Sequence, residues 1–490
     1  MTESASSDYQ RRDVAKMVKS KTDWDPALLA YAKAVALMKD PKKKNQKTDP
    51  TSWTFQANTH GVPGGVPSDA PEEWGQCPHG SPLFLPWHRA YVWYFERIVR
   101  KVINEELKIS GQQNWALPYW NYAHVQSGDK PPEYAGSKAW RQLPLAFRQE
   151  KLPDGVTDNP LRYPHRSIGD GAIPYLNVNP YAAMSESSFD GFSPSLESTP
   201  HNKVHTRVGN GQGMGSVPHA ALDPVFWLHH ANIDRLWYAW LRTHSNPAGR
   251  TWPKTRPGST KRYCFRDEKG TQIVLGDKPL FDAPAFDYCY ESLSDGTGTA
   301  PTKQVREVVS TVSVPAGDPL VARGGQTPLG AVPVRIEPTP VPDAGDALAP
   351  TLTADAGGAG QVVLTVRGVR AEKAPGVTYG VYLGAREDHD EDLDPYGPHF
   401  VGDLDFFGAS GADAHHQHDG NAGDGRTFTF DITDTLRTLR QTGLWSGEGV
   451  PPVSVAPIPN ESAPGSDRTQ PPLPVADAAP QFAELTISTN

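Results

Sequence analysis

Six of the sixteen histidines in the sequence form two groups of three, and imidazole is the commonest metal ligand among side chains. The groups are His60, His79 and His88, and then His201, His205 and His230. His201 and His205 are four residues apart, so a helix would present both imidazoles on one face. The pattern predicts metal ligands that helices bring to a shared interior.

The identity of the metal follows from what the two groups lack. Neutral imidazole binds copper, zinc, iron and nickel. The sequence has no HExxH motif of the kind used by zinc peptidases. Di-iron centres in helical proteins prefer Glu and Asp ligands, whereas these two groups contain only histidine. Copper is therefore favoured, although any one of these histidines taken alone would more often be structural.

Helices are expected to position most of these histidines. Residues 24–39 and 88–107 carry apolar side chains at helical spacing, and a shorter helical stretch includes 201–205. The segment 224–244 begins with a proline preceded by an aspartate, which is a typical helix start. Residues 128–200 are rich in Pro, Gly, Ser and Asn and are predicted to be mostly loop.

The pattern changes after Tyr290 to short segments rich in β-branched and aromatic residues, separated by Gly, Pro and Asp. This predicts a β-rich domain of sandwich or jelly-roll-like type. We expect a mainly α catalytic domain over 1–298, a connector over 299–330 and the β-rich domain over 331–490. In the first domain we expect a four-helix bundle around the metal site.

Charge is unevenly divided between the two predicted domains. Residues 341–490 contain 22 acidic and 8 basic residues, a net of −14, whereas the rest of the chain carries +5 of the total of −9. This difference is either a solvated acidic surface or an aid to docking. The overall negative charge gives no reason to expect a nucleic acid partner.

Compartment and partners are only weakly indicated. The polar start of the chain lacks the apolar core of a secretory signal, and no apolar run is long enough for a membrane span. Three cysteines in 490 residues argue against a disulfide scaffold. We expect a cytoplasmic protein with no membrane partner, with export alongside a partner protein as the alternative. The oligomeric state stays open.

Two motifs resemble the copper motifs of tyrosinases and polyphenol oxidases. The first is HGSPLFLPWHRAYVWYFERI, and the second is HNKVH followed by DPVFWLHHANIDRLW. With QANTH, which ends at His60, the resemblance covers most of residues 10–290. It implies a binuclear (type-3) copper centre with His60, His79 and His88 on the first copper and His201, His205 and His230 on the second.

The resemblance also implies roles for neighbours of the ligands. Cys77 stands two residues before His79, where some relatives have a thioether between Cys and His; an ordinary thiol is the alternative. His229 is expected either to support a ligand from beside it or to be structural. Asp234 is expected to orient a ligand imidazole, with an ion pair to a basic neighbour on the helix surface as the alternative. For Cys264 and Cys289 we expect buried free thiols.

Three further residues match positions that act on the substrate in the family. Glu197 and Asn202 match a pair proposed to hold a water and take the proton of an incoming phenol. The alternative for Glu197 is a carboxylate that stabilises a helix start. Val217 matches a position that gates the first copper, and the alternative is simple loop packing.

The C-terminal part resembles the domain that covers the copper site in latent polyphenol oxidases, with Tyr288 and Tyr290 matching the Y-x-Y element before it. Phe406 and Phe407 are candidates for the side chain that enters the substrate pocket, with at least one expected in the β core. A second group, His399, His415, His416 and His418, is either a copper-loading site or a polar loop.

The function implied is ortho-hydroxylation of small monophenols and oxidation of o-diphenols to o-quinones, with dioxygen as co-substrate and two copper ions as cofactor. One alternative is an o-diphenol or o-aminophenol oxidase without monophenolase activity. Another is a non-enzymatic oxygen carrier of the hemocyanin type.

Overall fold

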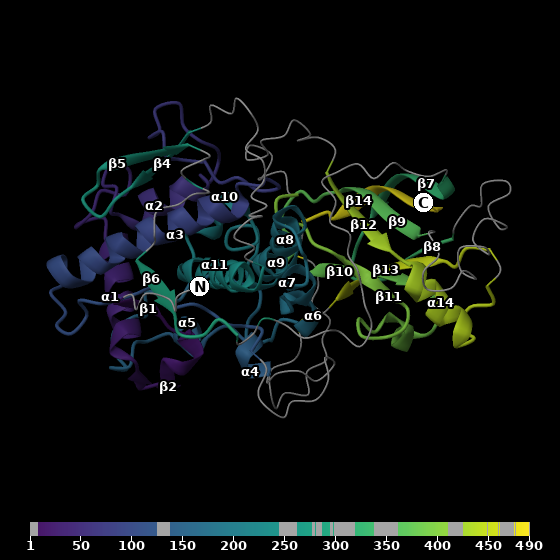
Figure 1. Ribbon diagram of the computed structural model, residues 1–490, viewed down its shortest axis with the longest axis horizontal. Coiled ribbons are helices and arrows are strands. Elements are labelled where there is room, and N and C mark those ends of the chain that lie inside the picture. Colours follow the sequence, from purple (N-terminus) through teal and green to yellow (C-terminus); the bar gives the residue numbers. More distant parts are fainter. Residues whose placement is uncertain are drawn as a thin grey trace.

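The computed structural model describes residues 8–124, 138–244, 262–276, 280, 287–294, 297, 319–337, 361–409, 425–447, 449–458, 460, 475 and 477–489. Figure 1 shows a mainly helical unit on the left and a β-rich unit on the right. The two meet where helix α9 (Lys203–Val208) packs against strand β10 (Thr378–Leu383). Among the described residues, no helix is both long and apolar enough to cross a bilayer.

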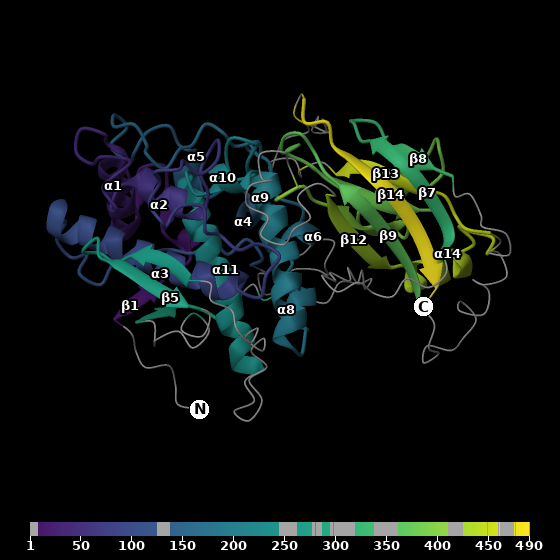
Figure 2. The ribbon, with the colours of Figure 1, turned by 90° about the horizontal axis from the view of Figure 1, so that it is seen from above.

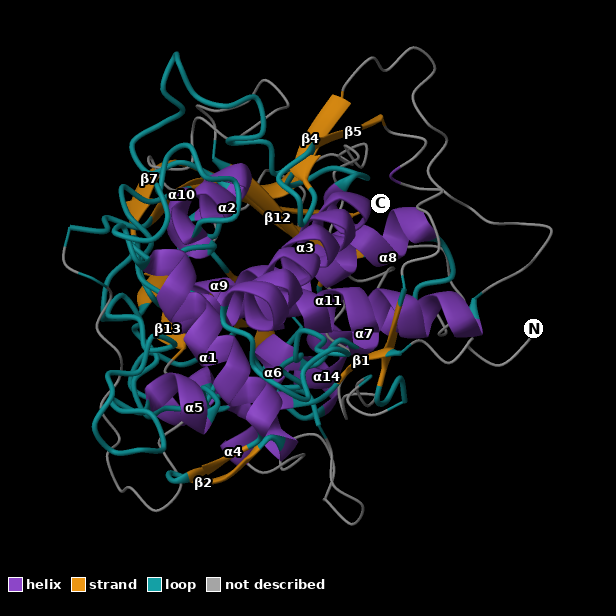
Figure 3. Ribbon diagram, turned by 90° about the vertical axis from the view of Figure 1, so that its left-hand side faces the viewer, coloured by secondary structure: helices purple, strands orange, loops and turns teal. Residues whose placement is uncertain are grey.

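The core of the helical unit is built around α3 (Phe84–Lys101) and α11 (Pro224–Thr243), which pack against each other. Their interface is aromatic, and the rings of Phe95 and Trp227 stack with centroids 3.4 Å apart. Both α1 (Pro26–Lys39) and α2 (Trp53–His60) contact this core. Seen from the helical side in Figure 3, α1, α3 and α11 lie in front of the β-rich unit.

Capping residues explain where the helices begin. Asp25 and Asp223 each accept a hydrogen bond from the backbone two residues on, and each is followed by a proline at the first helical position. The helices predicted over 24–39 and 224–244 are therefore confirmed to within two residues. The prediction for 88–107 was wrong at its start, because α3 begins one turn earlier, at Phe84.

The prediction that the segment 128–200 is mostly loop was too coarse. Within the described part of this segment the chain forms α4 (Lys138–Arg141), α5 (Leu145–Arg148), α6 (Tyr175–Val178), α7 (Tyr181–Met184) and α8 (Phe189–Leu196). Three of these begin directly after a proline. A π-helical turn, Glu197–Asn202, joins α8 to α9, and α10 (Val217–Ala220) follows.

Short strands complete the helical unit. Strand β1 (Tyr9–Arg11) runs parallel to β6 (Tyr288–Tyr290), which brings the start of the chain to the Y-x-Y element. The other two pairs are antiparallel, β2 (Val18–Ser20) with β3 (Asp23–Trp24), and β4 (Arg262–Arg266) with β5 (Gln272–Gly276). The η2 turn, Val102–Glu106, extends α3.

The β-rich unit consists of two four-stranded antiparallel sheets that share one core. One sheet has the order β11-β10-β13-β8, and the other has the order β12-β9-β14-β7. The remaining strands are β8 (Val334–Ile336), β9 (Val362–Val369), β11 (Phe400–Leu404), β12 (Arg426–Asp431), β13 (Val453–Ile458) and β14 (Gln481–Thr489). Helix α14 (Thr433–Gln441) adds Leu436 and Leu439 to the core.

Strand β7 (Pro319–Pro328) lies in the segment predicted as a connector over 299–330. It nevertheless pairs with β14 in an antiparallel ladder. The β-rich unit therefore already includes the described end of that segment. The sequence predicted only a few possible strands in this Pro- and Gly-rich connector, because both residues are uncommon in strand interiors.

Candidate metal centre

Two clusters of ligand side chains lie next to each other in the helical unit. The first contains His60, Cys77, His79 and His88; the second contains His201, His205, His229 and His230. Within each cluster the ligand atoms are within 4.8 Å of one another. The clusters are in contact, because His88 stacks on His230 with ring centroids 4.4 Å apart. The structure thus brings together all six predicted ligands.

Backbone carbonyls fix the orientation of three imidazoles. The Nδ1 atoms of His60, His88 and His205 lie 3.0, 2.8 and 2.8 Å from the carbonyl oxygens of Val217, Phe84 and Met214. Because a carbonyl only accepts, each Nδ1 carries the proton and each Nε2 keeps its lone pair. This is the arrangement found in metal-binding histidines.

Burial keeps the imidazoles neutral. Desolvation lowers the pKa of His88 to about 3 and moves the pKa values of His201, His205 and His230 well below their usual range. Neighbouring histidines lower the last three further. Neutral imidazole is the form that binds a metal, so these sites need no proton release at pH 7.

The donor set fits copper. Nε2 of His201 is buried with no hydrogen-bond partner, which is unfavourable unless a ligand occupies the space beside it. Apart from Cys77, every member of the clusters is an imidazole, and no carboxylate belongs to either. Imidazole-rich sites suit copper, whereas the carboxylates expected of a di-iron site are missing from them.

His229 is itself a member of the second cluster, next to the predicted ligands. Its Nδ1 is 3.2 Å from the hydroxyl of Tyr122, and its ring stacks on His201 at 5.4 Å. By contrast, Nε2 of His230 is 3.2 Å from Nε2 of His205, toward the other ligands. His229 and His230 therefore both belong to the second cluster, and the assignment of His230 as the ligand stays a prediction.

Cys77 is buried against two ligands of the first cluster. Its Sγ lies 3.5 and 3.7 Å from Nδ1 and Nε2 of His79, and 3.2 Å from Nε2 of His88. Nearly equal distances to both nitrogens are expected when the sulfur faces the ring carbon between them. The predicted proximity of Cys77 and His79 is therefore present.

Glu197 and Asn202 lie at the two ends of the π-helical turn before α9. Glu197 is buried and accepts a 2.7 Å hydrogen bond from the backbone N–H of Gly80. Desolvation raises its pKa to about 8, so the carboxyl is mostly protonated at pH 7 in this structure. The amide of Asn202 lies 2.9 Å from Nδ1 of His201, so both residues adjoin the metal ligands.

Phe407 covers the centre from the β-rich unit. Its ring stacks on His205 with centroids 4.1 Å apart, and it meets His79 and His201 edge-on at 5.3 and 5.5 Å. Phe406 instead packs in the β core beside Tyr379. Of the two candidates, Phe407 is the one that reaches the metal ligands.

Arg426 fastens the segment that carries Phe407. It donates to the carboxylate of Asp405 and, at 3.2 Å, to the carbonyl of Phe407. In the alternative amide orientation of Asn202, the amide oxygen accepts from Arg426 at 3.2 Å. Sequence reasoning missed Arg426, because no local pattern marks a strand residue that reaches another domain.

Asp234 does not contact a ligand imidazole, so its predicted orienting role was wrong. Its carboxylate pairs with Arg89 and Arg11 and accepts from the hydroxyls of Tyr288 and Tyr290. The arginines lower its pKa although burial opposes this. The alternative of an ion pair on the helix surface is also wrong, because Asp234 and both arginines are buried. The buried cluster ties the Y-x-Y element to α11.

Val217 contributes through its backbone. Its side chain is buried at the start of α10, and its carbonyl is the acceptor for His60. Gly61 makes this approach possible, because a Cβ there would lie 2.8 Å from Cα of Pro218. A gating role for the valine side chain stays a prediction.

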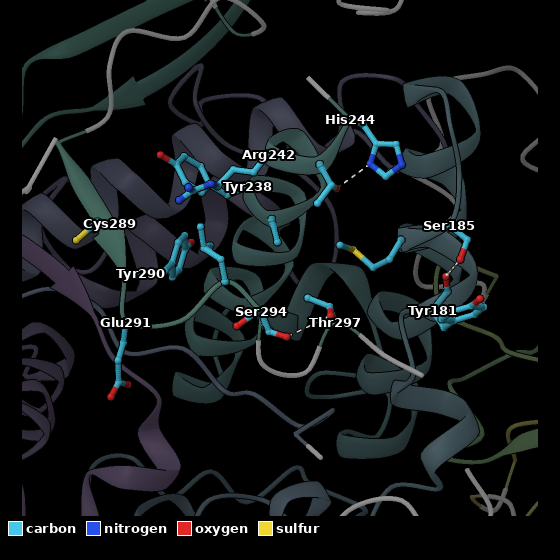
Figure 4. A pocket seen from close by; sticks show the side chains of 14 residues that line it. Tyr181, Ser185, Tyr238, Arg242, His244, Cys289, Tyr290, Glu291, Ser294 and Thr297 are labelled. Carbon is cyan, nitrogen blue, oxygen red and sulfur yellow. Dashed lines mark hydrogen bonds between the residues drawn. The ribbon is translucent and has the colours of Figure 1, made fainter. Parts of the chain in front are cut away.

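The other candidate residues lie away from the centre. His399 is buried and its Nδ1 donates to the carbonyl of Leu383, while His415, His416 and His418 fall outside the described residues. Cys264 is buried as expected, but Cys289 is partly exposed. Cys289 adjoins a groove of about 750 Å³ between α7, the end of α11 and β6, which no predicted metal ligand lines (Figure 4).

Comparison with known proteins agrees with this geometry. A family model described as the common central domain of tyrosinase matches residues 50–190 and 173–243, and a model of a domain of unknown function matches 326–466. The tyrosinase HcTyr1 of Hahella sp. is 31% identical over 463 residues, covering 87% of this chain and 92% of its own. Polyphenol oxidase A1 of Vicia faba is 30% identical, but this chain spans only 45% of it.

Solved structures show the same fold over the whole chain. Latent apple tyrosinase matches with a TM-score of 0.53 at 18% identity, covering 100% of this chain and 98% of its own. A latent aurone synthase matches with a TM-score of 0.54, also at 18% identity, covering 100% of this chain and 91% of its own. Both combine a helical catalytic domain with a C-terminal domain.

Proposed function

The chain belongs to the tyrosinase family, and from that premise we propose that it hydroxylates monophenols at the ortho position and oxidises o-diphenols to o-quinones, with dioxygen as oxidant. It is an oxidoreductase of the tyrosinase and polyphenol oxidase type rather than an oxygen carrier. The observation that carries the proposal is the pair of adjacent clusters of histidine side chains, of which all but His79 are buried.

The overall reactions balance without another reductant. A monophenol and one dioxygen give an o-quinone and one water, and two o-diphenols with one dioxygen give two o-quinones and two waters. We assign two copper ions to the histidines, with His60, His79 and His88 on one and His201, His205 and His230 on the other. The bound copper supplies the redox chemistry and the contact with dioxygen.

The chain's own residues hold the ring and move protons. Glu197 and Asn202 adjoin His201 and His79, so they are placed to take the phenol proton through a water. This role requires an ionised Glu197. Displacing the covering Phe407 segment would let water reach the Glu197 carboxyl and lower its raised pKa. In the covered form Glu197 is mostly protonated and therefore a weak general base.

Glu197 separates the full activity from its main alternative, an o-diphenol or o-aminophenol oxidase. Glu197→Gln keeps the size of the side chain but removes the base. We expect hydroxylation of tyramine to fall by roughly 100-fold, within the usual range for a general base, and oxidation of catechol to change little. Equal losses in both assays would show that Glu197 acts only in structure.

We also propose a thioether between Cys77 and His79, motivated by the position of Sγ beside the ring. Forming the C–S bond removes two hydrogen atoms, which copper and dioxygen can accept. The intact mass of reduced, denatured protein should fall by two hydrogens after copper loading in air. Complete alkylation of Cys77 in active enzyme would exclude the bond.

Metal analysis tests the proposed function directly. Protein loaded with copper should contain two copper ions per chain and should turn L-DOPA into a coloured quinone. His88→Ala and His230→Ala should each abolish the colour and lower the copper content. Zinc or iron retained in preference to supplied copper would overturn the proposal.

A further inference from the structure

Helix α9 carries charged side chains that the proposed reaction does not use. Lys203 and Arg207 are each two positions from His205, about half a helical turn, so they point away from the metal ligands. Both side chains are buried, with exposed fractions of 2% and 0%. Lysine and arginine are seldom this buried unless they are paired.

Their partners belong to the β-rich unit. Lys203 forms an ion pair with Asp403 of β11, itself 2% exposed. Arg207 donates to the hydroxyl of Thr378 in β10 and to the carbonyl of Ile458 in β13. One face of α9 thus carries the predicted ligand His205, and the opposite face is fixed to the β-rich unit.

Asn177 of α6 joins the two contacts into one network. Its amide nitrogen donates to Asp403 at 2.8 Å, and its amide oxygen accepts from Nε of Arg207 at 2.9 Å. Asn177 is fully buried. Figure 2 shows α6 and α9 at the boundary between the units.

Helix α9 has little support of its own. It has only six residues, and Thr199 in the preceding turn has a non-helical backbone. Helices this short are not stable alone, so tertiary contacts must set the position of α9. The position of His205 therefore depends on the contacts made by both faces of α9. The position of His201 depends on them as well, because the turn that contains it adjoins α9.

We infer that Lys203 and Arg207 are positioning residues for the second metal site, so that docking of the β-rich unit and copper binding at that site stabilise each other. The inference rests on the proposed copper function. Coupling of this kind is reciprocal: loss of the interface weakens the copper, and loss of the copper loosens the interface.

The test uses full-length protein loaded with two copper ions and then equilibrated with a graded series of a copper chelator. Asp403→Asn removes the carboxylate that pairs with Lys203. The variant should lose one of its two coppers at about tenfold lower chelator concentration than the wild type, which is the scale of change seen for supporting residues at metal sites. The copper that remains should give the EPR signal of an isolated Cu(II) ion. The first site should be retained.

Two matched variants control for general loss of stability. The double variant Lys203→Met, Asp403→Leu replaces the ion pair by apolar contact and should retain copper as the wild type does. Tyr396→Phe removes an interdomain hydrogen bond to the backbone of Tyr175 at the start of α6, outside the ion pair of Lys203 and Asp403, and should also leave copper retention unchanged. Loss of both coppers together in Asp403→Asn would indicate unfolding and overturn the inference.

Hydrogen exchange supplies the reciprocal readout. In the wild type, copper should slow amide exchange in α9 and in β10 across the interface, whereas in Asp403→Asn the effect on β10 should disappear. Equal copper retention and equal exchange in the two proteins would overturn the inference and leave the copper function intact. A wild type that binds no second copper would instead defeat the proposed function.

Discussion

Phe406 and Phe407 are adjacent in the chain but have opposite environments. Phe407 lies on three histidines of the metal centre, whereas Phe406 lies in the core between the sheets. The chain turns directly after Phe406, where the backbone N–H of Ala409 donates to the carbonyl of Phe406, so the two side chains leave the backbone in different directions. The choice between them depends on where the segment docks, which the sequence alone does not state.

This difference gives a prediction for each phenylalanine. Phe407→Ala should raise the activity of the full-length enzyme about 2- to 10-fold, since a stacked aromatic contact contributes roughly 0.5–1.5 kcal/mol to the closed form. Phe406→Ala should instead lower the free energy of unfolding by about 3–5 kcal/mol through a cavity. Catechol turnover and chemical denaturation of both variants check this, and an unchanged turnover in Phe407→Ala would contradict the covering role.

At the scale of elements, the helices that hold ligands were largely predictable. Residues 24–39 and 224–244 have clear periodicity and capping signals, and the i, i+4 spacing of His201 and His205 indicated one helical face. The four-residue helices after residue 137 were missed, because a single turn is too short to show a period.

The contacts between elements were not predictable. Lys203 and Arg207 would ordinarily be assigned to a solvated face, because their type is mostly exposed. Asp403, which buries Lys203, lies 200 residues further along the chain. Asp234 shows the same limit: the basic residues that hold it are Arg89 and Arg11, both distant in sequence.

The approach of α2 to α10 gives a prediction at this scale. Gly61→Ala places a Cβ 2.8 Å from Pro218 and 3.0 Å from the carbonyl oxygen of Val217, so it should push away the group that orients His60. We expect copper affinity at the first site to fall by about 10- to 100-fold, as when other orienting partners are lost. Chelator titration measures this.

Gly324→Ala is the matched control, because a Cβ there meets no atom within 4 Å. It should leave copper binding as in the wild type. If Gly61→Ala also binds copper normally, α10 must be free to shift while the hydrogen bond to His60 is kept.

For the whole molecule, the charge difference between the halves suggested docking by long-range attraction. The described interface indicates another mechanism, because Lys203, Asp403 and Arg207 are buried and bonded at short range. At 1 M salt the Debye length is about 3 Å, so interactions between exposed charges farther apart than this are largely screened. Buried pairs are screened much less. The acidic surface of the β-rich unit is then mainly solvated.

Salt and mutation should therefore have different effects on latency. Raising NaCl toward 1 M should change the turnover of the full-length enzyme less than about twofold, since screening acts weakly on buried pairs. Asp403→Asn should activate it at low salt, because the buried ion pair with Lys203 is then lost and docking weakens by about 3–5 kcal/mol. Turnover of catechol at equal copper content, with and without salt, measures both effects. Strong activation of the wild type by salt alone would show that exposed charges hold the two units together, and the buried network would then serve only to orient α9.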